Sequence, residues 1–202
     1  MSSFLLCSSP IHGHLLPMLA IAKYLVGRGH QVSVLSGSRF QQAIADTGAT
    51  PLALSGYADF DDRVFVDELP ERHKHSGIAK IRYDVQHVFV LPFPDQYRAV
   101  QHALATIKPD VILAETAFMG LLPLLLGDPA KRPPVVGIGV LPLAQMSKDV
   151  APFGLGLAPL AKPFGPLRNR LLNALVRRVI FRSTDKLANQ LLSKLGSAPL
   201  QD

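Results

Sequence analysis

Residues 4–26 read FLLCSSPIHGHLLPMLAIAKYLV, and this stretch carries the clearest structural pattern in the chain. It opens with an apolar run over residues 4–8, which predicts a short buried strand. Residues 15–26 then repeat apolar side chains at three- and four-residue spacing, which predicts a helix. Pro17 suits the first turn of that helix and Gly29 suits its end. We therefore expect a strand, a short turn and a helix, in that order.

The same alternation continues along the chain. Further strands are predicted at residues 31–35, 50–54, 111–114 and 135–140, and further helices at 38–46 and 117–126. Apolar strands that alternate with helices form a parallel sheet covered on both faces. The predicted fold class is therefore α/β, a doubly wound, Rossmann-like parallel sheet.

One domain is predicted for residues 1–202, with its sheet core in 1–55 and 108–145. The region between them, 56–107, begins with an acidic loop and continues as helix interrupted by prolines. A connection of that length inside a compact domain is usually functional. Residues 151–200 combine a Gly/Pro-rich linker with a basic, amphipathic helical segment.

Composition limits the class of protein. The chain has 202 residues, 48% of them hydrophobic and 18% charged, so it can bury a core of ordinary domain size. Its one cysteine rules out a disulfide framework and fits a reducing, cytoplasmic location. The start lacks the pattern of a secretory signal. No export is therefore expected. The most hydrophobic stretch, 111–126, is too short and too interrupted to form a membrane-spanning helix, so no transmembrane segment is expected either.

The positive charge is concentrated near the end of the chain. Net charge is +6, and residues 162–194 hold eight Lys or Arg against Asp185 alone. Only Phe164 and Phe181 lie among these bases, so nucleic-acid binding is not expected. The basic helix 167–194 fits a peripheral contact with a membrane. The favoured alternative is a helix docked on the sheet or on another domain, with its arginines in water.

The turn after the first strand is the expected site. In an open parallel sheet, ligands bind beyond the carboxyl ends of the strands. The turn lacks the glycine pattern of dinucleotide-binding folds, which argues against NAD or FAD. It carries His12 and His14 instead, and imidazole accepts protons near neutral pH. His14 is thus a candidate base, with local helix capping as the alternative and His12 as the competitor.

A family resemblance selects between the two histidines. Residues 9–19, with 22–25 and 27–32, resemble the opening of UDP-dependent family-one glycosyltransferases of the GT-B fold, and the likeness continues at 38–40, 47–49 and 108–115. It covers most of residues 4–140. The family's catalytic base is the histidine of a Gly-His-x-x-Pro motif, which matches Gly13, His14 and Pro17. The resemblance therefore implies that His14 is the base.

The partner of that base departs from the family pattern. An aspartate after the fourth strand usually orients the histidine, and Glu115 stands at the matching position here. Glutamate is one methylene longer, so it can still reach the ring but with different geometry. The alternative is that Glu115 caps the following helix.

The resemblance implies the N-terminal, acceptor-binding half of an inverting enzyme that transfers a hexose from a UDP-sugar to a hydroxyl of a hydrophobic small molecule. We expect Ile11, His12, Phe118 and Leu141 to contact the acceptor. No cofactor is expected, and the UDP-sugar would bind mainly a C-terminal nucleotide-sugar domain that this sequence lacks. The alternatives are a non-catalytic small-molecule-binding module and the acceptor-binding subunit of a split glycosyltransferase.

One short acidic motif, Asp59-Phe60-Asp61, is similar to the metal-binding Asp-x-Asp of another glycosyltransferase fold. Such motifs match by chance very often, and this one falls in a predicted surface loop. No metal site is expected.

Overall fold

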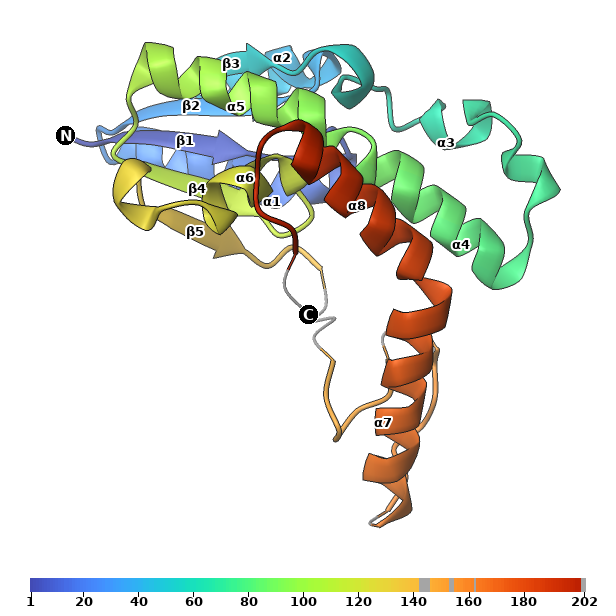
Figure 1. Cartoon of the computed structure of the whole chain (residues 1–202). Helices are drawn as coiled ribbons and strands as arrows, with labels where there is room; N and C mark the ends of the chain where they lie inside the picture. The colour runs from blue at the N-terminus through green and yellow to red at the C-terminus, as the bar shows by residue number, and fades with distance from the viewer. Residues whose placement is uncertain (142–145, 153–154, 162, 201–202) are drawn as a thin grey trace.

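The computed structural model describes residues 1–141, 146–152, 155–161 and 163–200 (Figure 1). Within them, five strands form one sheet: β1 (Ser3–Cys7), β2 (Gln31–Ser36), β3 (Thr50–Ala53), β4 (Val111–Glu115) and β5 (Val135–Ile138). The strand order is β3-β2-β1-β4-β5 and every pairing is parallel. The predicted α/β fold class is confirmed.

Eight α-helices are described. They are α1 (His12–Gly27), α2 (Gln41–Ala45), α3 (Phe65–Glu68), α4 (Gly77–Val85), α5 (Phe93–Ile107), α6 (Leu122–Leu126), α7 (Phe164–Leu175) and α8 (Arg182–Lys194). Single turns of 3-10 or π-helix join several of them, notably the π-helical turns Gln86–Val90 and Val176–Ile180.

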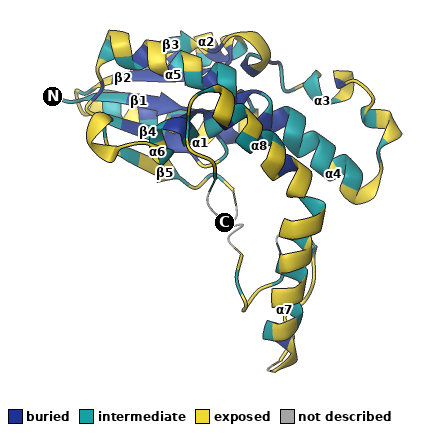
Figure 2. Ribbon diagram, in the orientation of Figure 1, coloured by how far each residue is buried: buried dark blue, intermediate teal, exposed yellow. Residues whose placement is uncertain are grey.

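The two faces of the sheet bury different helices because strand side chains alternate. Leu5 and Cys7 of β1 point into one core cluster, which includes Val100 and Ala103 of α5. Leu6 belongs to the opposite cluster, formed largely by side chains of α1, α2 and β2. Figure 2 shows the central strands β1, β2 and β4 as largely buried, whereas the edge strands β3 and β5 are intermediate or exposed. The predicted doubly wound arrangement follows from this alternation.

The register brings the ends of β1 and β4 together. Cys7 lies opposite Leu35 of β2 on one side and Ala114 of β4 on the other. After β3 the chain crosses the sheet and returns as β4 on the far side of β1. The carboxyl ends of β1 and β4 therefore form the point at which the strand order reverses, where open α/β sheets bind ligands.

Several predicted element boundaries were wrong. Helix α1 starts at His12 instead of residue 15, so Pro17 lies inside the helix and not in its first turn. Of the predicted helix 117–126, only Leu122–Leu126 is α-helix, preceded by a 3-10 turn. Strand β5 stops at Ile138 rather than 140. The last residues of the predicted sheet core, 142–145, lie outside the described residues.

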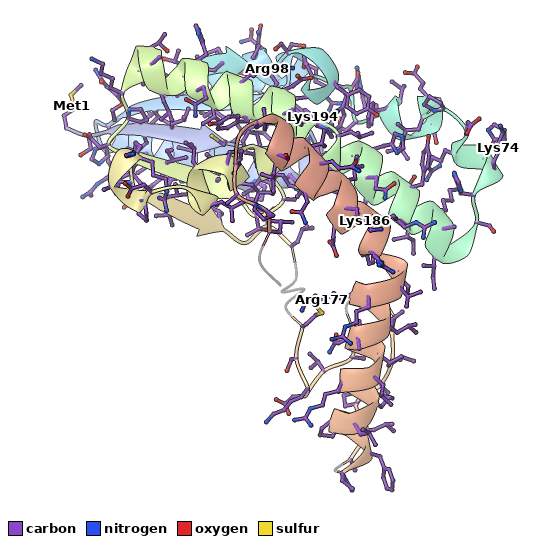
Figure 3. All side chains as sticks on the ribbon, viewed as in Figure 1. Met1, Lys74, Arg98, Arg177, Lys186 and Lys194 are labelled. Atoms are coloured by element: carbon purple, nitrogen blue, oxygen red, sulfur yellow. The ribbon has the colours of Figure 1, made fainter. Side chains whose placement is uncertain are left out.

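The basic tail is not one helix. It divides into α7, the π-helical turn and α8. Ala188 and Leu192 of α8 pack with Val90 and Phe93 in a third buried cluster. In Figure 1 α7 extends away from the sheet, and Figure 3 labels Arg177, Lys186 and Lys194 along the tail. Of the predicted basic helix, only α8 therefore packs on the domain, whereas α7 extends away from it. Across the described part of the chain, no helix is both long and apolar enough to cross a membrane.

Candidate active site

His14 and Glu115 meet at the strand-order reversal. His14 lies in the first turn of α1 and Glu115 is the last residue of β4. The ring nitrogen Nδ1 of His14 is 3.1 Å from Oε2 of Glu115. The two residues are only 7% and 1% exposed. The structure therefore brings together the predicted base and its predicted orienting carboxylate, within the reach expected for such a pair.

Backbone amides hold the carboxylate of Glu115 in place. Its Oε1 accepts a hydrogen bond from the backbone N–H of Ser9 at 3.2 Å, and its Oε2 accepts one from Ala117 at 2.6 Å. Burial by itself raises the pKa of Glu115, but the contact with His14 and these two amides outweigh it, so the pKa lies below its ordinary value. The carboxylate is thus charged at neutral pH.

The contact between the two side chains is close. The approach of Nδ1 to Oε2 is an ion-pair contact that does not meet the full geometry of a hydrogen bond. On its other side, the ring of His14 lies 5.8 Å from the ring of Phe89, measured between centroids, at a tilt of 34°. Because Nδ1 faces Glu115, Nε2 is the ring nitrogen that a substrate hydroxyl can approach. A base oriented through Nδ1 and acting through Nε2 is a recurrent catalytic arrangement.

The two sequence-based roles of Glu115 are not exclusive. Its bond to Ala117 is local and shapes the turn that follows β4, as the capping alternative required. Its bond to Ser9 and its contact with His14 reach across to the turn after β1. One buried carboxylate therefore ties the ends of two strands together.

The acidic loop is part of this neighbourhood, which the sequence did not reveal. Asp62 accepts a hydrogen bond from the backbone N–H of His12 at 2.7 Å, at the start of α1. Asp59 accepts one from the N–H of Ser38 at 2.7 Å. Arg39 lies 2.8 Å from Asp61 and 2.5 Å from Asp62. Carboxylates at helix starts are favourable because unpaired N–H groups point outward there.

These contacts give the acidic motif a structural role. Hydrogen bonds from Arg63, joined by Arg39, hold the pKa of Asp61 well below its usual range. Among the described ranges, no group of three or more His, Cys, Asp or Glu side chains is placed to hold a metal ion. The loop 59–62 instead anchors region 56–107 to the turn that carries His14.

The predicted acceptor contacts differ in their surroundings. Ile11 is half-buried just before α1, and His12 is exposed with its ring 6.4 Å from that of Phe40. Leu141 is 48% exposed. Phe118, in contrast, is only 4% exposed and belongs to the core cluster beneath the site, a position that suits packing.

Comparison with known proteins agrees with this geometry. No family model matches the chain. It is 31% identical to UDP-glucosyltransferase A1 of Starmerella bombicola over 95% of its length, and 29% identical to 4'-demethylrebeccamycin synthase of Lentzea aerocolonigenes over 95%. The chain spans 42% and 45% of these two relatives.

Solved structures give the same picture of the fold. The chain superposes on the calicheamicin glycosyltransferase CalG4 with a TM-score of 0.60 and 17% identity, over 97% of this chain and 43% of that one. The chain is thus similar to the N-terminal part of UDP-dependent glycosyltransferases, and its fold matches the N-terminal half of the GT-B glycosyltransferases.

Proposed function

We propose that this chain is the acceptor-binding half of an inverting, UDP-sugar-dependent glycosyltransferase in which His14 is the general base. The observation that carries the proposal is the 3.1 Å contact between Nδ1 of His14 and Oε2 of Glu115, at the edge of the sheet where ligands bind. A buried carboxylate beside an imidazole orients the ring and stabilises the imidazolium that forms when it takes a proton.

The proposed reaction is a single displacement. Nε2 of His14 accepts the proton of an acceptor hydroxyl while the hydroxyl oxygen attacks the anomeric carbon of the sugar. The new C–O bond forms as the bond to UDP breaks, and UDP leaves from the opposite face with its electron pair. One base and one displacement invert the anomeric centre. Glu115 stays ionised throughout and acts only through the ring.

A hydrophobic small molecule is the proposed acceptor. Four large apolar side chains of region 56–107 are substantially exposed: Tyr57, Val64, Ile78 and Ile81. This region is joined to the His14 turn through Asp62. Small-molecule sites are mostly apolar with a few polar groups that set orientation. Two similar proteins are named for small molecules, 4'-demethylrebeccamycin and calicheamicin, which supports this class of acceptor.

A hexose from UDP-hexose is the proposed donor group, because Starmerella bombicola UDP-glucosyltransferase A1 is named for such a donor. The chain spans less than half of that relative, so we assign donor binding mainly to a C-terminal nucleotide-sugar domain. Transfer needs a donor held in line with the acceptor. The chain by itself is therefore expected to bind acceptors weakly and to transfer nothing.

The experiment joins this chain to the C-terminal half of a similar glycosyltransferase and follows product formation with a panel of UDP-sugars and apolar alcohols. Turnover by the joined protein, inversion at the anomeric carbon, and loss of turnover in His14→Ala are the expected results. Acceptor binding without turnover, by a joined protein whose donor half binds UDP-sugar, would instead identify a non-catalytic binding module. Turnover by the chain alone would contradict the assignment of donor binding to a separate C-terminal domain.

A further inference from the structure

An apolar stripe runs along the outside of α7 and the π-helical turn that follows it. Five large side chains at helical spacing form the stripe: Phe164 (71% exposed), Leu167 (58%), Leu171 (64%), Leu175 (47%) and Val179 (63%). In Figure 2 exposed residues recur along the whole of this helix, and on this side of it they are large and apolar. Such a stripe is normally turned toward a core, so its exposure here requires an explanation.

The inner side of α7 is already occupied. Its polar side chains form hydrogen bonds with the backbone of the preceding segment. Asn169 donates one to the carbonyl of Lys148 at 3.1 Å, and Asn173 donates one to the carbonyl of Ser147 at 2.8 Å. Arg168 donates to the carbonyl of Ala158 at 2.9 Å. These bonds fix which face of α7 points inward, and the apolar stripe is left on the outside.

The segment beside α7 is also apolar on its surface. Four of its side chains are about half exposed: Met146 (51%), Val150 (55%), Leu157 (46%) and Leu160 (51%). Together with α7 and the π-helical turn they form a projecting arm, here called the apolar arm, whose described residues are 146–152, 155–161 and 163–180. Figure 1 shows the arm pointing away from the sheet.

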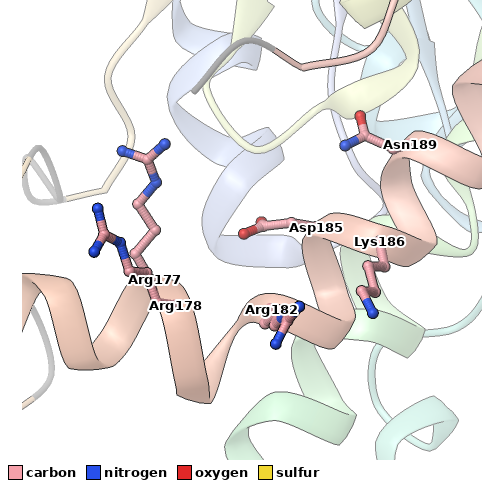
Figure 4. A pocket seen from close by; sticks show the side chains of 6 residues that line it. All are labelled: Arg177, Arg178, Arg182, Asp185, Lys186 and Asn189. Carbon is pink, nitrogen blue, oxygen red and sulfur yellow. The ribbon is translucent and has the colours of Figure 1, made fainter.

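The charge around the arm is mostly positive. From Val150 to Thr184 the sequence contains no Asp or Glu, but it contains five arginines and one lysine. Asp149, within the arm, and Asp185, just beyond it, are the acids that flank this run. At the junction with α8, a hollow of about 670 Å³ is lined by Arg177, Arg178, Arg182, Asp185, Lys186 and Asn189 (Figure 4). A hollow rich in guanidinium groups suits phosphate oxygens.

We propose that the apolar arm binds the surface of an anionic lipid bilayer, with α7 lying in the plane of the headgroups. The exposed stripe would enter the boundary of the acyl chains, and the arginines would pair with lipid phosphates. An amphipathic helix with basic residues on its polar side binds membranes in this way. The charge favours this partner, since the excess of arginines over the two flanking acids, Asp149 and Asp185, complements a uniformly negative surface.

The first test uses an introduced fluorophore. The chain has no tryptophan, so Phe164→Trp creates a single reporter in the stripe and leaves an aromatic side chain in place. We expect a blue shift of its emission on mixing with vesicles of phosphatidylcholine and phosphatidylglycerol, and a much smaller shift with phosphatidylcholine alone. Added salt should reduce the shift, because it screens the charges. Tyr24→Trp, at an exposed position of α1, is the control and should not respond.

The second test separates the contribution of the arginine charges to membrane binding from that of the apolar side chains. Arg178→Gln with Arg182→Gln should lower partitioning into the anionic vesicles by about tenfold to thirtyfold. Lys23→Gln with Lys131→Gln removes the same charge from exposed sites outside the arm and should change it little. Leu171→Ser with Leu175→Ser should lower partitioning at least about tenfold, since both side chains leave water on binding. Ile78→Ser with Ile81→Ser, on exposed positions of α4, is the matched control.

The results of these tests decide whether the apolar arm binds a membrane or another protein domain. Circular dichroism checks that each variant keeps its helix content. Absence of binding to anionic vesicles at low salt would overturn the proposal, as would equal losses in the arm variants and their controls. If the introduced indole responds to a C-terminal half of a glycosyltransferase but not to vesicles, the arm is a domain interface and the membrane proposal is wrong. None of these measurements depends on transfer activity.

Discussion

Nδ1 of His14 and Oε2 of Glu115 lie 3.1 Å apart, although one residue follows the first strand and the other ends the fourth. The parallel pairing of β1 with β4 places Cys7 opposite Ala114, so Glu115 lies beside the turn that follows β1, and this turn leads into the first turn of α1, where His14 lies. The pair is therefore a product of sheet register, and its predicted role in catalysis can be tested residue by residue.

His14→Ala is expected to lower turnover by about 10² to 10⁴ fold in the protein joined to a nucleotide-sugar domain, the range for loss of a general base. Rates are measured with saturating donor and acceptor. His12→Ala is the control, because His12 is exposed and meets Asp62 only through its backbone N–H. If His12→Ala abolishes turnover and His14→Ala does not, the base lies two residues upstream of the position proposed here.

Glu115→Asp tests the departure from the family's aspartate. The shorter side chain cannot reach the amides of Ser9 and Ala117 and the ring of His14 together, so we expect a loss of about 1 to 3 kcal/mol in the free energy of unfolding. Urea unfolding measures it. Turnover should also fall, because the ring loses its orienting partner. Unchanged stability and turnover would mean that the backbone moves to keep the contacts of the shorter side chain. The extra methylene of Glu115 would then affect neither stability nor catalysis.

The stability supplied by Glu115 is expected to depend on pH. Its pKa in the folded chain is lowered, so the unfolded state binds its proton more readily and folding is favoured where the group is ionised. This contribution is complete above the unfolded pKa of about 4.3 and is lost as pH falls through the lower folded pKa. The gap in unfolding free energy between the wild type and Glu115→Gln should therefore narrow in acid. A gap that widens below pH of about 4 would contradict the lowered pKa.

Asp62→Ala should loosen the acidic loop from α1. The carboxylate bonds the N–H of His12 and lies beside Arg39, and a carboxylate at a helix start contributes about 0.3 to 1 kcal/mol. We expect that loss in stability and, in the joined enzyme, a higher KM for the acceptor. Asp128→Ala removes a comparable bond to the N–H of Ala130 far along the chain. It should lower stability without changing KM, and an equal KM effect in both variants would argue against a local role for Asp62.

Gly37→Ala probes the packing of the turn that carries His14. A Cβ at Gly37 would lie 2.5 Å from Cβ of Pro10 and 3.3 Å from Oδ1 of Asp59, so the turn or the loop must move. Overpacking of this kind costs about 1 to 3 kcal/mol, which thermal unfolding can measure. Gly137→Ala in β5 meets no atom within 4 Å and should be neutral or slightly stabilising. Equal melting temperatures for both variants would show that the turn can move to accommodate the added Cβ without loss of stability.

Much of the fold could be predicted because the signals are local. The apolar runs that form β1 and β4 are short and lie between turn residues, and the helical spacing of residues 15–26 allows one buried face. The rule that ligands bind beyond the strand ends pointed to the turn that carries His12 and His14. The resemblance to family-one glycosyltransferases then selected His14, and it singled out Glu115 as the residue at the position of the family's aspartate.

The remaining features were decided by contacts between distant segments. Phe118 looks like a site residue in the sequence, but the crossing of α5 over the sheet buries it in the core. The acidic loop looks like solvated surface, but its carboxylates meet the open N–H groups at the start of α1. The basic tail has one amphipathic pattern, yet α8 finds the apolar surface around Phe93 and α7 does not. A sequence thus specified which side chains are apolar, charged or able to accept a proton, whereas only the tertiary structure determined which surface each one meets, because burial depends on strand order, register and helix crossing.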